Sequence, residues 1–80
     1  MHELHLIRDL MEDLMHRAHL EKAVRVIKVT LVLGVFTEID PSIFRSYFSE
    51  NSTGSILEGA ELDIRRSSRR EIRLVSFDCE

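Results

Sequence analysis

The chain has 80 residues, of which 44% are hydrophobic and 31% charged, and its formal net charge is −3. These values are typical of one small folded domain, and the acidic balance disfavours a general nucleic-acid binder. No apolar run reaches the roughly 20 residues of a membrane span, and the charges at Glu3, Arg8 and Asp9 do not fit a signal peptide. The single cysteine, Cys79, excludes an internal disulfide and a four-cysteine zinc site, so we expect a reduced, cytoplasmic protein.

Residues 3–23 are predicted to form one long amphipathic helix. Apolar side chains recur at steps of three and four residues, and charged side chains occupy the positions between them. Neither glycine nor proline interrupts the segment. The apolar stripe consists of Leu4, Ile7, Met11, Leu14 and Ala18, and it is widened by Leu6, Leu10, Met15 and Leu20.

A strand over residues 25–34 and a second helix follow. One side of the strand is entirely apolar, which predicts that it faces a layer of helices. The helix begins with Asp40 as its N-cap and Pro41 as its first residue, and we expect it to end near Glu50. The apolar side of the strand comprises Ile27, Val29, Leu31 and Leu33, and that of the helix comprises Ile43, Phe44, Tyr47 and Phe48.

Two further strands are predicted at about residues 61–65 and 71–78, joined by a tight connection at Ser67 and Ser68. In the last strand the apolar positions change parity after Leu74, which predicts a bulge. The order is α-β-α-β-β, and the first two strands can form a right-handed parallel crossover. We therefore expect a single α+β domain over residues 1–80, with two helices packed on a small three-stranded mixed sheet. Its free sheet edges would allow a homodimer.

Three segments in the same order resemble the HypA family, whose members deliver nickel to [NiFe]-hydrogenase and, in some organisms, to urease. The first is Met1-His2-Glu3, directly followed by an amphipathic helix; the second spans residues 26–48, from strand to helix; the third is TGSILEGAELDI at residues 53–64. The resemblance implies a nickel metallochaperone rather than an enzyme. It also implies a HypB-like GTPase and the hydrogenase large subunit as partners, with neither nucleic acid nor membrane involved.

The chain departs from the family between its last two strands. HypA proteins carry a zinc-binding domain with paired CxxC motifs at that point, whereas here Arg65-Arg66-Ser67-Ser68-Arg69-Arg70 joins the strands directly. We therefore expect the zinc-domain insertion to be absent near residues 67–69, with no zinc site. The chain is then a natural short relative or an engineered deletion.

The N-terminal tripeptide has donors that suit Ni(II). The Met1 amine, the deprotonated amide nitrogen of His2 and the imidazole Nδ1 of His2 can occupy three corners of a square plane, a geometry that Ni(II) accepts. The fourth position could be filled by the Glu3 carboxylate, by His5, by water or by a partner protein. The resemblance implies His2 as the main ligand with Glu3 in support, so the predicted metal site is Met1, His2 and Glu3.

Other polar groups have simpler interpretations. His16 and His19 are three residues apart without a third ligand nearby in sequence, which is more typical of two solvated side chains. The cluster of Arg65, Arg66, Arg69 and Arg70 is interpreted as a solvated hairpin tip, although it could also dock an acidic partner or be read by a basophilic kinase. No phosphate-binding loop or nucleophile elbow is present in the sequence.

Two functional hypotheses follow from these patterns. The first is a metallochaperone-like domain that binds Ni(II) at its N-terminus for delivery to a maturing nickel enzyme. The second is a metal-free protein-interaction module that keeps the same fold and binds through the arginines or an exposed sheet edge.

Overall fold

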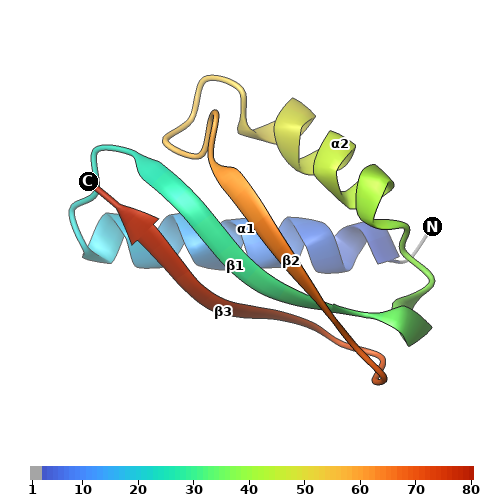
Figure 1. Cartoon of the computed structure of the whole chain (residues 1–80). Coiled ribbons are helices and arrows are strands. Elements are labelled where there is room, and N and C mark those ends of the chain that lie inside the picture. The colour runs from blue at the N-terminus through green and yellow to red at the C-terminus, as the bar shows by residue number, and fades with distance from the viewer. Residues whose placement is uncertain (1–2) are drawn as a thin grey trace.

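The computed structural model describes residues 3–80 (Figure 1). It confirms the predicted order of helices and strands and adds one short 3-10 turn, η1. The elements are α1 (Glu3–Leu20), β1 (Val26–Gly34), η1 (Val35–Thr37), α2 (Pro41–Ser52), β2 (Glu61–Ser67) and β3 (Ile72–Cys79). Neither helix of the described part is long and apolar enough to cross a membrane.

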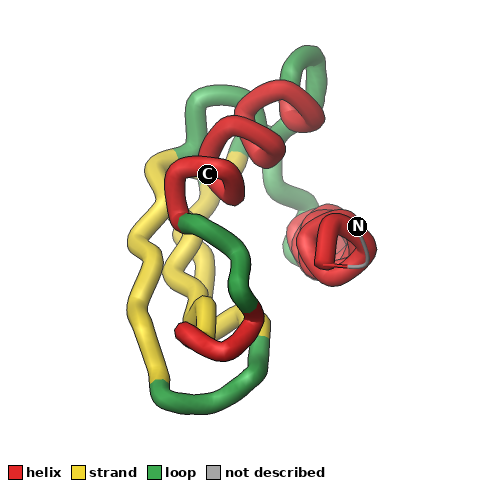
Figure 2. Tube along the Cα trace, turned by 90° about the vertical axis from the view of Figure 1, so that its right-hand side faces the viewer, coloured by secondary structure: helices red, strands yellow, loops and turns green. Residues whose placement is uncertain are grey.

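The three strands form one mixed sheet in the order β2-β1-β3. β1 is central, runs parallel to β2 and antiparallel to β3, and α2 lies in the crossover between the two parallel strands. Figure 2 shows α1 as a separate layer, seen end-on beside the sheet. The expected α+β fold, with two helices packed on a small mixed sheet, is therefore confirmed.

One apolar core joins both helices to the sheet. Side chains of α1, α2 and alternate positions of β1 are buried in it, because the helical and strand periodicities each direct one apolar face inward. The fully buried members include Ile7, Leu14 and Ala18 from α1, Val29, Leu31 and Leu33 from β1, and Phe44 from α2.

Four positions of the predicted apolar faces are exposed, and two of them, Leu6 at 42% and Leu20 at 69%, are among the residues that widen the stripe of α1. Ile27 is 39% exposed and its neighbour Val26 is buried, because the pairing of β1 with β3 shifts register between Val26 and Lys28. Ile43 is 56% exposed at the start of α2, while Phe44 and Phe48 fill the core. A shift of one residue exchanges the two faces of a strand. The alternation of apolar residues in the sequence does not show where such a shift occurs.

α1 ends at Leu20, three residues before its predicted end. The amide of Ala23 donates to the carbonyl of Ala18, and the amide of Lys22 donates to that of His19. These two bonds form a Schellman motif, with Lys22 in the left-handed region at φ 56°. Glycine usually occupies this position, so the sequence carried no stop signal there.

β2 and β3 run antiparallel but lie on either side of β1, so the expected hairpin is wrong. Their connection crosses the end of β1 at Gly34, whose amide donates to the carbonyl of Glu71 at 2.8 Å. The predicted bulge is confirmed, because Thr30 pairs with Ser76 and Leu31 pairs with Leu74, which leaves Val75 as the extra residue.

Candidate metal centre

The predicted nickel ligands lie at the start of the chain. Met1 and His2 lie outside the described residues, and so does the side chain of Glu3. α1 begins at Glu3, at the same end of the molecule as the start of α2 (Figure 1). The structure therefore describes the surroundings of the predicted site but does not test its ligand set.

A shallow hollow of about 210 Å³ opens beside the first turns of α1. Leu4, His5 and Arg8 of α1 line it together with Tyr47 of α2. Leu4 belongs to the apolar stripe of α1 and Tyr47 to the aromatic face of α2, whereas His5 and Arg8 add polar groups to the wall.

His5 was one of the candidates for the fourth nickel position. Its Nδ1 atom accepts a hydrogen bond from the guanidinium of Arg8 at 3.0 Å, so the ring proton belongs on Nε2 in this arrangement. A ring nitrogen must offer a free lone pair to bind a metal ion. His5 would therefore have to exchange its bond with Arg8, or change tautomer, before it could act as a ligand.

α2 is held in place by the N-cap that the sequence predicts. The Oδ1 atom of Asp40 accepts hydrogen bonds from the amide of Ser42 at 2.8 Å and from its hydroxyl at 2.6 Å. The Ser42 hydroxyl and amide bonds, with a smaller attraction from Arg66, lower the pKa of Asp40. This cap fixes the start of α2, and with it the wall that Tyr47 provides.

His16 and His19 line a different groove of about 480 Å³ between α1 and the end of α2, together with Met11, Met15 and Tyr47. Among the side chains that the structure describes, those of residues 4–80, no three from His, Cys, Asp or Glu are grouped closely enough to hold a metal ion. Glu12 also lines this groove, but among the described side chains it does not complete a three-residue site with the two histidines.

Cys79 is exposed at the end of β3. This end of the chain lies at the opposite side of the molecule from the start of α1 (Figure 1). The thiol is therefore far from the region where nickel binding is predicted.

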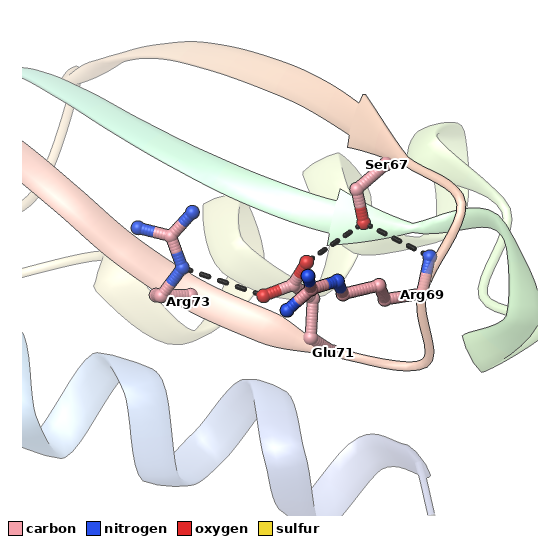
Figure 3. A network of polar contacts seen from close by, with 4 residues as sticks. All are labelled: Ser67, Arg69, Glu71 and Arg73. Carbon is pink, nitrogen blue, oxygen red and sulfur yellow. Dashed lines mark hydrogen bonds and ion pairs between the residues drawn. The ribbon is translucent and has the colours of Figure 1, made fainter.

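The four arginines at the connection between β2 and β3 are exposed, as expected, but the connection does not form a hairpin and carries a network of hydrogen bonds (Figure 3). The Ser67 hydroxyl donates to Glu71 Oε2 at 2.9 Å and accepts from the Arg69 amide at 3.3 Å. Arg73 Nε donates to Glu71 Oε1 at 3.3 Å. The bond from Ser67, with smaller contributions from Arg73 and Arg69, lowers the pKa of Glu71.

Sequence reasoning missed Glu71 as the centre of this network. Arg66 has a similar structural role, because its Nε donates to the carbonyl of Leu33 at 2.8 Å. In the sequence analysis Arg66 is counted only as a charge of the arginine cluster, and Glu71 only as the start of the last strand. The signal in the sequence for the bond between Ser67 and Glu71 was their four-residue spacing across a short connection.

The fold is that of a small α+β domain, with a helical layer packed on a three-stranded mixed sheet. The solution structure of the Ni metallochaperone HypA from Helicobacter pylori has this fold, with a TM-score of 0.68 and 20% identity, over 92% of this chain and 70% of that one. The family model for HypA, described as "Hydrogenase/urease nickel incorporation, metallochaperone", matches residues 1–79. The chain belongs to the HypA family, a family of maturation factors and not of enzymes.

Two curated relatives are similar in sequence. The hydrogenase maturation factor HypA of Chlorobium limicola is 38% identical over 64 residues, which cover 80% of this chain and 55% of that protein. The HypA protein of Caldanaerobacter subterraneus is 37% identical over 62 residues, covering 78% and 54% respectively. The chain thus spans about half the length of the curated relatives it matches.

Proposed function

We propose that the chain is a nickel metallochaperone that binds Ni(II) at its N-terminus and delivers it to a maturing nickel enzyme such as [NiFe]-hydrogenase. The observation that carries the proposal is the family match, which begins at residue 1 and so includes the Met1-His2-Glu3 sequence. The proposed ligands are the Met1 amine and the amide nitrogen and Nδ1 of His2. Glu3 is the supporting fourth ligand.

The start of α1 is compatible with this chelate. The first N–H groups of a helix have no acceptor within the helix, and α1 begins at Glu3, one residue after His2. Metal binding at the amide of His2 would therefore not remove a hydrogen bond from α1. This position differs from the interior of a helix, where each amide is already used.

Charge balance explains why Glu3 is proposed as a supporting group. A helix N-terminus carries about half a positive charge, which opposes a cation. The deprotonated amide of His2 and the carboxylate of Glu3 together supply two negative charges, which balance the two positive charges of Ni(II). We therefore expect Glu3 to strengthen binding while His2 is required for it.

The family resemblance also suggests the partners. A HypB-like GTPase and the hydrogenase large subunit are the proposed partners, in the reducing cytoplasm. We further propose that the family's zinc-domain insertion is absent near residues 67–69, so any partner contact made by that domain would be missing from this chain.

A calorimetric titration with Ni(II) tests the proposal. It compares the wild-type chain, bearing its own N-terminal methionine, with the His2→Ala and His16→Ala variants. Binding that is lost in His2→Ala and kept in His16→Ala supports the N-terminal site. Equal binding by all three proteins would leave the interaction module, the second hypothesis, as the better account.

A further inference from the structure

An exposed apolar pair follows β1. Val35 and Phe36 of η1 are 47% and 62% exposed, whereas the next residue, Thr37, is buried. The hydroxyl of Thr37 donates to the carbonyl of Gly34 at 2.7 Å and accepts from the amide of Ile39 at 3.3 Å. Buried hydrogen bonds thus fix the turn, so the aromatic ring is held at the surface and does not belong to a loose loop.

The connection between β2 and β3 lies at the same end of the sheet as η1 (Figures 1 and 2). Gly34, which directly precedes Val35, donates its amide to the carbonyl of Glu71. Its Cα lies so close to the carbonyl of Arg69 that no side chain fits between them. The apolar pair therefore emerges beside the connection. We call the combined region the Phe36–arginine surface, which consists of Val35, Phe36, Arg65, Arg69, Arg70 and Arg73.

Two of its arginines flank the central strand. Arg65 of β2 and Arg73 of β3 both pair in register with Val32 of β1, so they lie on the same face of the sheet. Their side chains are 63% and 60% exposed. Their ion pairs, with Asp63 at 3.5 Å and Glu71 at 3.3 Å, are surface contacts of small net energy that an incoming carboxylate can replace.

The charge of this region is opposite to that of the rest of the molecule. Residues 63–73 contain five arginines, one aspartate and one glutamate, a net charge of +3, whereas the whole chain carries −3. The remainder therefore carries −6. An acidic group is attracted to this region and repelled elsewhere, which orients its approach.

We propose that the Phe36–arginine surface docks an acidic segment of a partner protein. An apolar side chain of that segment packs on Phe36 and Val35, and its carboxylates face the arginines. Aromatic residues and arginine are enriched at the energetic centres of interfaces. The negative remainder of the chain disfavours a long polyanion such as nucleic acid. The inference requires neither nickel nor the N-terminal residues.

Synthetic peptides provide the test, followed in two-dimensional NMR spectra of the isotope-labelled chain. The main probe is a short peptide of glutamates and leucines. One comparison peptide has serine for leucine, another has lysine for glutamate, and an oligothymidylate represents nucleic acid. We expect saturable shifts at residues 34–37 and 65–73 with the first peptide, and binding at least about fivefold weaker with the others.

Matched variants show whether the named residues carry the binding. Phe36→Ser should weaken peptide binding at least about fivefold. Leu20→Ser should not weaken it, because Leu20 is a similarly exposed apolar residue, 69% exposed, at the C-terminal end of α1. The Arg69→Ser and Arg70→Ser double change should also weaken it, while Arg17→Ser on α1 should not. Both Phe36 and Leu20 are exposed, so neither change empties the core.

Three results would overturn the inference. They are the absence of saturable shifts on the Phe36–arginine surface, unchanged affinity of the Phe36→Ser variant, and tighter binding of the oligothymidylate than of the acidic peptide. Nickel is absent from each sample, so these outcomes are independent of the N-terminal metal site.

Discussion

The carbonyl oxygen of Arg69 occupies the place where a side chain on residue 34 would begin. A Cβ atom built on Gly34 would lie 1.9 Å from that oxygen, well inside van der Waals contact. Gly34 has φ −68° and ψ 144°, which any residue can adopt, so glycine is required here by space and not by backbone conformation. The contact lets a short connection pass over the end of β1 and place β3 on its far side.

Gly34→Ala should therefore lower the free energy of unfolding by about 1–3 kcal/mol, because backbone must move to admit the methyl group. Denaturant unfolding measures this. Inserting one glycine between Ser68 and Arg69 should restore part of the loss in the Gly34→Ala chain by lengthening the connection. A loss below about 0.5 kcal/mol would contradict the close crossing.

The core should sustain cooperative folding without zinc. Leu14 is fully buried, and Leu14→Ala should cost about 2–5 kcal/mol of unfolding free energy. Leu20 is 69% exposed, and Leu20→Ala should change it by less than about 0.5 kcal/mol. Chemical unfolding in the presence of a metal chelator measures both values. A chain that stayed unfolded until zinc was added would contradict this account.

The sequence predicted the fold well where local signals were strong. The amphipathic stripe of α1, the Asp40 cap and the parity change at Val75 each correspond to a feature of the structure. These signals depend on neighbouring residues, whose spacing is visible in the sequence.

Features that depend on tertiary contacts could not be predicted. The position of β3 beside β1, and not beside β2, follows from the crossing over Gly34. The exposure of Ile27 follows from a register shift. The hydrogen bond between Ser67 and Glu71 likewise needs the turn to form first. The metal site was predicted from donor chemistry and resemblance, and its ligand set stays a prediction.

Glu71 should make stability depend on pH in the acid range. Its pKa is lowered from the ordinary value of 4.5, chiefly by the bond from Ser67. The stabilisation is therefore present above pH 4.5 and is lost as the pH falls through the lower pKa of the folded state. Thermal unfolding from neutral to acidic pH should show a smaller acid loss for Glu71→Gln and for Ser67→Ala than for wild type.

The exposed Glu50 provides the control for that series. Glu50→Gln should leave the acid dependence near that of the wild-type chain. If Glu71→Gln and Ser67→Ala lost stability toward acid as steeply as wild type, the network of Figure 3 would not be linked to protonation of Glu71.

The arginine side chains should contribute little to folding. Changing both Arg69 and Arg70 to serine should shift the free energy of unfolding by less than about 1 kcal/mol, because exposed charges interact weakly. The bond to Ser67 uses the amide of Arg69, which the change retains. Nickel affinity should be unchanged in a calorimetric titration. A loss of nickel affinity would contradict the proposed position of the metal site at the N-terminus.

The most direct test of the central claim is the nickel affinity of a chain extended by one glycine before Met1. The extension converts the Met1 amine into an amide and moves the free amine out of the chelate, while leaving the side chains of His2 and Glu3 unchanged. We expect affinity to fall at least about tenfold, or 1.4 kcal/mol, and to weaken further as protons compete for the donors at lower pH. Equal affinity of the extended, His2→Ala and wild-type chains would contradict an N-terminal nickel site.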